Sequence, residues 1–332
     1  MRHASLFMLL LASCTASGKN SSGEINSLPS SIETEQYVNM NARISADEEK
    51  PIGAFLSEVG NRVQAWSNAR YQGNDEQVRL LEGVLKFECL QRQAELIVQL
   101  ETGPPRNRSL AAVALGFTNS HVIIDPDKSL ELVDRGALAV SPLLSATMDE
   151  NAQVASNALM GLGILGRVET PLEPICDALD TSPNGAIRTN ASYALLGILG
   201  ASKNIATDFA IAQLEMVRES CQRGLTDTEM SVRTQTAAAL GLVGNAESIP
   251  HLGDRLSDEI PIVAQSATTA LARIGRDQQN LKGRVARLLS SRLDLVQPTR
   301  RETLLVGLVM LAETNLGEET EKWVDWAAKL PR

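Results

Sequence analysis

The sequence predicts an all-α protein, an α–α superhelix of about five to six stacked helix pairs with capping helices at both ends. Three features indicate this fold. One apolar helical pattern recurs between Asn107 and Ala312, a proline-containing helix precedes several copies, and an acidic turn joins the two helices. Because one such helix pair cannot bury its apolar face alone, the copies must stack, and a stack of this type is typical of binding rather than of catalysis.

The three clearest copies, from Val154, Val232 and Val263, show the same order of residue types; the copy from Ile187 carries one extra residue before Gly200, and those at Asn107 and Pro298 are weaker. A branched apolar residue is followed by a small residue at positions four and seven, by Leu at position eight and by Gly at position twelve. These spacings put the apolar and small residues on one side of a helix. The three clearest copies and the copy from Ile187 begin about 31 to 45 residues apart, as expected of a two-helix unit with variable loops. In chain order the copies start at Asn107, Val154, Ile187, Val232, Val263 and, roughly, Pro298.

Glycine recurs at position nine of the pattern as well as at its end. Glycine at position nine costs a helix about 1 kcal/mol relative to Ala, so its repetition predicts close contact between neighbouring helices. Glycine at the end of a copy predicts a left-handed helix cap. The position-nine glycines are Gly116, Gly163 and Gly241, and the closing glycines are Gly166, Gly200, Gly244 and Gly275.

An aspartate follows the first helix of each clear unit. Its carboxylate can accept hydrogen bonds from the free N–H groups that open the second helix, and it suits the dipole of that helix. A bound cation is the alternative interpretation, and we favour capping. The four residues are Asp149, Asp180, Asp227 and Asp258.

This unit, with a second helix of the form V-x-x-x-A-x-x-A-L-G-x-x-G, resembles the HEAT repeat, in particular the variety named after phycobilisome lyases. The resemblance runs from near Asn107 to Ala312 and implies a HEAT-like α-solenoid. It does not imply one activity, since the group includes scaffolds, adaptors and a few enzymes. The His-Glu dipeptides through which some HEAT-like enzymes bind iron are absent from this sequence, and we find no counterpart of the reactive residues of the chromophore lyases.

Amphipathic segments flank the repeats. Apolar residues recur every three or four residues over 52–66 and over 75–101, and a shorter helix is expected over 317–330. Elements of this sort cap an open stack. We therefore expect N-terminal capping helices over 51–104, HEAT-like repeats over 105–312 and a C-terminal capping helix over 313–332.

The first residues have the form of a targeting signal. A short basic start precedes the apolar run 6–11, which is too short to span a bilayer as a helix. The string Leu11-Ala12-Ser13-Cys14 that follows resembles the lipobox of bacterial lipoproteins, in which the Cys is lipidated. This resemblance implies a signal peptide over 1–13, a lipidated Cys14 at the head of a polar linker over 14–50, and a stable membrane anchor. Thr15 in place of an Asp after the cysteine favours the outer membrane, with the solenoid facing the periplasm of the bacterial envelope.

The net charge of −9 argues against nucleic acid as a partner, because phosphate backbones are bound by Lys and Arg. One region differs from the rest. Basic residues gather near the C-terminal end, where they form either the solvated face of an amphipathic helix, which we favour, or a docking patch for an acidic partner or anionic lipid. The candidate residues of that patch are Arg276, Arg284, Arg287 and Arg292.

The sequence contains no recognisable catalytic or metal-binding motif. His121 and His251 do not form a metal-binding spacing, C-x-x-C is absent, and there is neither a P-loop nor a Gly-x-Ser-x-Gly string. We expect no cofactor, no metal and no enzymatic activity. Cys89, Cys176 and Cys221 are expected to be small buried hydrophobic residues; a bridge between the last two is the alternative.

In the resembled fold the second helices line the concave face, where positions two, three and six should be exposed. Position three is an amide in three consecutive copies, and a row of amides can bind the backbone of an extended peptide. Ordinary solvent-facing polar residues are the alternative interpretation. The candidate partner-binding residues are Ser156, Asn157, Met160, Thr189, Asn190, Tyr193, Thr234 and Gln235.

The function predicted from these features is that of a membrane-anchored lipoprotein that serves as a non-catalytic protein-binding scaffold or adaptor. Two alternatives belong to other classes of protein. One is an accessory subunit of a lyase-like enzyme whose partner chain supplies the reactive groups. The other is a carbohydrate-binding or cell-wall-binding module, supported by the neutral polar groove alone.

Overall fold

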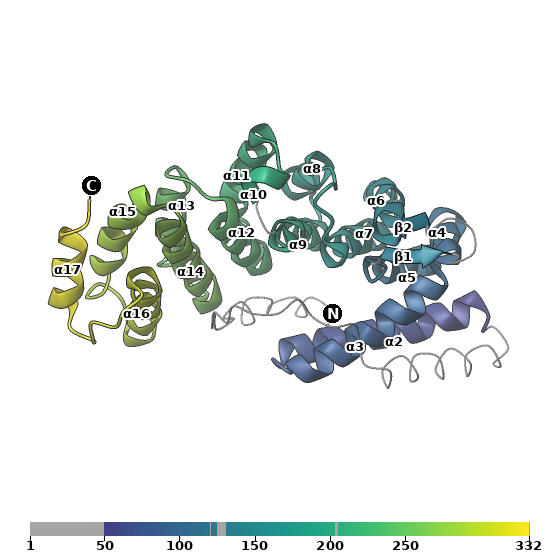
Figure 1. Cartoon of the computed structure of the whole chain (residues 1–332), viewed down its shortest axis with the longest axis horizontal. Coiled ribbons are helices and arrows are strands. Elements are labelled where there is room, and N and C mark those ends of the chain that lie inside the picture. The colour runs from purple at the N-terminus through teal and green to yellow at the C-terminus, as the bar shows by residue number, and fades with distance from the viewer. Residues whose placement is uncertain (1–49, 120, 125–130, 203–204, 332) are drawn as a thin grey trace.

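The structure, a computed structural model, describes residues 50–119, 121–124, 131–202 and 205–331. Cys14 and the linker after it lie outside these residues. The helices form two rows along an arc (Figure 1). The second helices of the units make the inner row, in which each helix packs against the next. They are α5 (Pro105–Gly116), α7 (Ala152–Leu165), α9 (Gly185–Ala201), α12 (Met230–Val243), α14 (Pro261–Asp277) and α16 (Pro298–Ala312).

The first helices make the outer row, and each packs against the second helix that follows it in the chain. They are α4 (Gln93–Thr102), α6 (Arg135–Ala146), α8 (Glu173–Thr181), α11 (Ile211–Gly224), α13 (Ser248–Arg255) and α15 (Gln279–Ser290). The short α10 (Ile205–Asp208) precedes α11, and α17 (Thr320–Ala328) packs on α15. The predicted solenoid is therefore confirmed, with six helix pairs in the part of the chain that the structure describes.

Two elements differ from the prediction. A small antiparallel hairpin joins α5 to α6, formed by β1 (His121–Ile124) and β2 (Glu131–Asp134). The single helix expected over 75–101 is two helices, α3 (Asp75–Gln91) and α4, which meet at Arg92. The division has a packing reason, because α3 pairs with α2 (Ile52–Tyr71), whereas α4 turns away to pack against α5 and α6.

The helices α2 and α3 form an antiparallel pair that lies across the open side of the arc and faces the inner row (Figure 1). α2 packs against α5 through the buried side chains of Phe55, Leu56 and Val59 and of neighbouring residues. The pair is therefore more than an end cap, since it covers part of the face on which the second helices are exposed.

Close contact between second helices is confirmed at the position-nine glycines. A Cβ added at Gly163 would lie 3.0 Å from Cα of Ala194, and one added at Gly241 would lie 3.0 Å from Cα of Ala270. The closing glycines differ from one another. Gly166 ends α7 in the left-handed conformation, with φ of 61°, as expected. The prediction is wrong for the other three: Gly244 ends α12 in an extended conformation, while Gly200 and Gly275 lie within helices that continue past them.

The aspartates of the turns join successive units, and the expected capping of the second helices by them is wrong: the side chains of Asn151 and Asn184 cap α7 and α9, while α12 and α14 have no side-chain cap. Asp258 accepts a hydrogen bond from the backbone N–H of Ile260 (3.0 Å) and pairs through both oxygens with Arg233 of α12 (3.0 Å each). Asp227 pairs in the same way with Arg188 of α9. Asp149 does so with Arg108 of α5. Asp180 is bound by Arg223 and Ser220 of α11 instead. Among the described residues, no group of three or more His, Cys, Asp or Glu is arranged to hold a metal ion.

Candidate functional site

The tip of the α2–α3 pair roofs a cavity of about 380 Å³ on the inner row. Trp66 and Arg70 of α2 and Glu82 of α3 form the roof. The floor crosses four consecutive second helices, α7, α9, α12 and α14, and is mostly apolar and small. We call this space the roofed groove. Its floor includes Ile164, Tyr193, Leu196, Gly197, Ala238, Gly241, Leu242, Thr269, Ala270 and Arg273.

Polar contacts hold the roof together. Trp66 donates from Nε1 to the carboxylate of Glu82 (3.0 Å), and the Arg70 guanidinium pairs with the same carboxylate (3.4 Å). Arg70 also lies over the indole of Trp66, 5.1 Å from the ring centroid. The indole also packs against the ring of Phe117 in an edge-to-face arrangement, with ring centroids 5.4 Å apart. The tryptophan thus ties the tip of the pair to the end of α5, and the roof is an ordered part of the fold.

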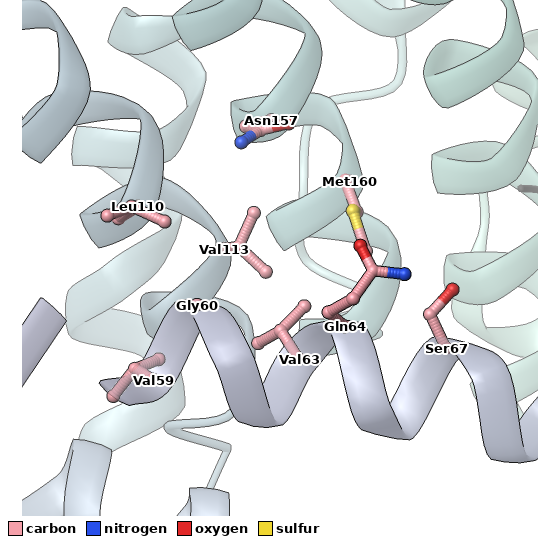
Figure 2. A pocket seen from close by; sticks show the side chains of 9 residues that line it. All are labelled: Val59, Gly60, Val63, Gln64, Ser67, Leu110, Val113, Asn157 and Met160. Atoms are coloured by element: carbon pink, nitrogen blue, oxygen red, sulfur yellow. The ribbon is translucent and has the colours of Figure 1, made fainter. Parts of the chain in front are cut away.

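A second, smaller cavity of about 150 Å³ lies between the middle of α2 and the helices α5 and α7 (Figure 2). Val59, Gly60 and Val63 of α2 face Leu110 and Val113 of α5 across it. Asn157 and Met160 of α7 close its far side. Its lining is largely aliphatic, so it extends the apolar character of the covered face towards the first unit of the stack.

The expected exposure of positions two and three is wrong for the candidate partner-binding residues, although Gln265, at position two of the last clear copy, is exposed. Ser156, Asn190, Thr234 and Gln235 are buried, and Asn157 and Thr189 are half-buried. The cause is the close approach of neighbouring second helices, which brings these side chains between them. Position six does reach the covered face: Tyr193 lines the roofed groove and Met160 lines the smaller cavity. Both are nearly covered, with exposed fractions of 6% and 4%.

The amides at position three form hydrogen bonds between neighbouring second helices. Asn157 donates to the hydroxyl (2.8 Å) and carbonyl (3.1 Å) oxygens of Ser109 in the preceding second helix. Asn190 donates to the same two groups of Ser156. The third amide, Gln235, accepts from the hydroxyl of Ser192 (2.6 Å). The amide groups of Asn157 and Asn190 therefore act as hydrogen-bonding links between units and leave the groove to other residues.

Sequence reasoning missed positions nine and ten, which form most of the groove floor. They contribute Gly163 and Ile164 from α7, Leu196 and Gly197 from α9, Gly241 and Leu242 from α12, and Arg273 at position ten of α14. A signal for them was present, because position ten follows position six by four residues and position three by seven, which places all three on one side of a helix. The glycine at position nine predicts close helix contact, and in the structure it also leaves space in the groove because it has no side chain.

The basic residues near the C-terminal end do not act as one patch. Arg287 of α15 donates to the backbone oxygens of Ala327, Leu330 and Pro331, and so holds the end of α17. Arg276 pairs with Asp277 (3.0 Å), Arg292 is half-buried, and Arg284 is exposed. Arg287 therefore has a structural role at the C-terminal end of the described chain, and among the four residues of the predicted patch Arg284 is the most exposed.

The three described cysteines are free thiols in the core. Burial raises the pKa of Cys89 and of Cys176 to about 12, and raises the pKa of Cys221 well above its ordinary value. This confirms the interpretation of these residues as small buried hydrophobic side chains, since protonated, inaccessible thiols are poor nucleophiles and poor metal ligands. Within the described ranges, no helix is both long enough and apolar enough to cross a bilayer.

No protein-family profile matches the sequence, and no curated protein matches it as a relative. The structure does match solved structures. Kap95p superposes with a TM-score of 0.53 at 15% identity, over 89% of this chain and 41% of Kap95p. That structure is of a complex in which Kap95p binding induces the switch loops of RanGDP to adopt the GTP-bound conformation. A computationally designed armadillo repeat protein for modular peptide recognition gives a TM-score of 0.45 at 18% identity, over 65% of this chain and 98% of its own.

The complex of CpcE and CpcF of phycocyanin lyase from Nostoc sp. PCC7120 gives a TM-score of 0.40 at 19% identity, over 65% of this chain and 75% of that chain. At such identities the comparisons concern fold and not activity. The fold and the covered inner row define the class: this is an armadillo/HEAT-like helical-repeat solenoid, and the resemblance to HEAT repeats expected from the sequence is confirmed at the level of fold.

Proposed function

We propose that this protein is a membrane-anchored, non-catalytic scaffold that binds a segment of a protein partner in the roofed groove. The observation that carries the proposal is the groove itself, a cavity of about 380 Å³ bounded by four successive second helices and by the tip of the α2–α3 pair. Pockets of about 300–1,000 Å³ with apolar walls and a few polar groups are typical binding sites.

The composition of the groove supports binding rather than chemistry. Its floor is largely aliphatic or small, with Ile164, Leu196 and Leu242 among the half-buried side chains. Its titratable groups among the described residues are Arg70, Glu82, Arg273 and Tyr193. Burial raises the pKa of Tyr193 to about 12, so this phenol is a poor proton donor or acceptor at neutral pH. Kap95p, which shares the fold, also binds a protein.

Anchoring is the second part of the proposal. The string Leu11-Ala12-Ser13-Cys14 behind a short apolar run supports lipidation at Cys14, and the polar residues that follow would hold the solenoid away from the bilayer. We infer residence in the outer membrane of a bacterial envelope, facing the periplasm. Cys14→Ser should move the protein from the membrane fraction to the soluble fraction and remove a lipid mass increment from the mature chain. A serine variant that still sediments with membranes would contradict the anchor.

The groove is tested by filling it. Ala238 of α12 lines the groove and is half-buried, so Ala238→Arg places a long charged side chain in the space that a partner would use. Ala212→Arg on the outer-row helix α11 is the matched control, because Ala212 is exposed and does not line the groove.

Both variants and the wild type would be used to capture partners from detergent-solubilised membranes, with circular dichroism confirming that helicity is retained. We expect Ala238→Arg to lose a partner that the wild type and Ala212→Arg both retain. If all three proteins retain the same partners, the groove is not the binding site.

A further inference from the structure

We propose that the segment bound in the roofed groove carries a carboxylate next to an aliphatic side chain, and that Arg273 binds the carboxylate. This inference rests on the proposed function and names the chemistry of the partner. It depends on three observations: the hydrogen bonding of Arg273, the charge balance of the groove, and the shape of the floor beside Arg273.

Arg273 has a donor without an acceptor. Its Nε is shielded from solvent and makes no hydrogen bond with any described residue. Asp277, one turn further along α14, lies 3.7 Å away, which is beyond hydrogen-bonding distance. The carboxylate of Asp277 accepts instead from Nε of Arg276 at 3.0 Å. Buried donors are normally paired, so the unpaired Nε of Arg273 in the wall of the groove is available to an acceptor on a bound segment.

Arg273 has only part of a counter-charge, because the carboxylate of Asp277, which lies outside the groove lining, is shared between Arg273 (3.7 Å) and Arg276 (3.0 Å). On the roof, the positive charge of Arg70 is balanced by Glu82 at 3.4 Å. Among the described residues that line the groove, Arg273 is the remaining charged residue, so the lining carries one positive charge in a chain whose net charge is −9. The Arg273 side chain is 38% exposed and lines the groove. Its planar fork of donors matches a carboxylate better than it matches any neutral acceptor.

The floor beside Arg273 suits an aliphatic neighbour. Ala270 is one turn before Arg273 on α14, and Gly241 packs so closely that a Cβ added there would lie 3.2 Å from Cβ of Ala270. Leu242 and Ala238 border the same space. Small residues keep this floor low, and a branched aliphatic side chain would bury apolar surface there without displacing the backbone.

A peptide segment fits this lining better than a lipid tail does. The groove crosses four successive second helices, and polar groups recur along it at Tyr193, Thr269 and Arg273 as well as on the roof. The amide groups of an extended peptide need such partners along their length, whereas an acyl chain has no use for them beyond its head group. The occupant we infer is therefore an extended peptide with Asp or Glu beside Leu, Ile or Val.

A random peptide library, selected separately on four forms of the full chain, tests the inference. The forms are the wild type, Arg273→Gln, the control Arg276→Gln, and the groove-filled Ala238→Arg. Arg276 lies on the same helix, does not line the groove and is 40% exposed, so it is a matched control for loss of one arginine. Helicity of every form is checked by circular dichroism.

We expect the wild type and Arg276→Gln to enrich peptides with Asp or Glu beside an aliphatic residue. Arg273→Gln should lose that preference, and its affinity for a selected acidic peptide should fall about ten- to a hundredfold, the effect of one charge-assisted hydrogen-bonded contact. The affinity of the wild type should also weaken as salt is raised, whereas that of Arg273→Gln should change less.

The contrary outcomes distinguish the two proposals. Peptides that require an unfilled groove but show no acidic preference, or an acidic preference that survives in Arg273→Gln, overturn the role of Arg273 and leave the groove as the binding site. Peptides that bind Ala238→Arg as well as the wild type overturn the groove itself, and the inference with it.

Discussion

The side-chain amide of Asn190 donates to both the hydroxyl oxygen (2.8 Å) and the carbonyl oxygen (2.9 Å) of Ser156, one unit earlier in the stack. Asn157 makes the same pair of hydrogen bonds to Ser109. A residue that looks like a solvent-facing amide in the sequence is thus a connector between second helices. These bonds lie in a buried setting, where leaving a polar group unpaired is costly.

Asn190→Ala should therefore lower the free energy of unfolding by about 1–3 kcal/mol, since both hydrogen bonds from the amide to Ser156 are lost in a site closed to water, and the Ser156 hydroxyl keeps only its bond to the carbonyl of Ala186. Thr189→Ala is the control, because Thr189 is half-buried and its hydroxyl makes no hydrogen bond with a described residue. Urea denaturation followed by circular dichroism measures both. Equal stability of the two variants would show that the amide contributes nothing to the stack.

Two glycines of α9 should respond in opposite ways to the same substitution. A Cβ at Gly197 would overlap the backbone carbonyl of Gly163 in α7, whereas a Cβ at Gly200 would meet nothing within 4 Å. We expect Gly197→Ala to destabilise the protein by about 1–3 kcal/mol, the range for overpacking. Gly200→Ala should leave stability unchanged or raise it by up to about 1 kcal/mol, through helix propensity. Thermal unfolding of the two variants measures the difference, and similar melting temperatures would contradict the contact.

Stability should fall steeply in acid. Burial by itself raises the pKa of Asp258, but the hydrogen bonds and charge of Arg233 and the backbone N–H of Ile260 outweigh it, so the pKa is lowered overall. The same balance lowers the pKa of Asp227 and of Asp149. A carboxyl whose folded pKa lies below its unfolded value of about 3.9 stabilises the fold above that pH, and the stabilisation is lost as the pH falls through the folded pKa.

The measurement is the free energy of unfolding in urea between neutral pH and acid. We expect a loss that begins near pH 4 and grows below it. Asp258→Asn should be less stable at neutral pH by about 3 kcal/mol, because it leaves the buried guanidinium of Arg233 without its ion pair. The same variant should show a shallower decline in acid, having one carboxylate fewer to protonate. A decline as steep as that of the wild type would mean that Asp258 is not among the responsible groups.

We expect Arg287→Ala to loosen the packing of α17 on α15. This side chain binds three backbone oxygens at the end of α17, whereas its neighbour Arg284 is exposed. Hydrogen exchange of the α17 amides should accelerate in Arg287→Ala and stay unchanged in Arg284→Ala, while the amides of α12 remain protected in both. Uniform exchange across the wild type and both variants would show that α17 is held by its apolar contacts alone, chiefly the buried Trp323.

The sequence alone predicted the repeating unit, because its information is local. The helical spacing of apolar residues from Val154 or Val232 and the glycine at position nine can be recognised within one unit, and both have the predicted role in the structure. The aspartate before the second helix can be recognised in the same way, but its partner is an arginine of another helix, which the local sequence does not show. The terminal helices over 52–66 and 317–330 were also visible as amphipathic patterns.

The groove could not be predicted in this way, because it depends on contacts between units and on a helix pair from elsewhere in the chain. Asn190 has the same polarity whether it faces water or a neighbouring helix, and only the spacing between α7 and α9 decides that it binds Ser156. Likewise, the sequence pattern around Trp66 does not indicate that α2 packs over the inner row. Trp66 is far in sequence from Ala238 and Arg273, with which it lines the groove. Periodicity determined which residues form helices and which face is apolar. Tertiary packing decided which part of that face is covered and which part remains open to a partner.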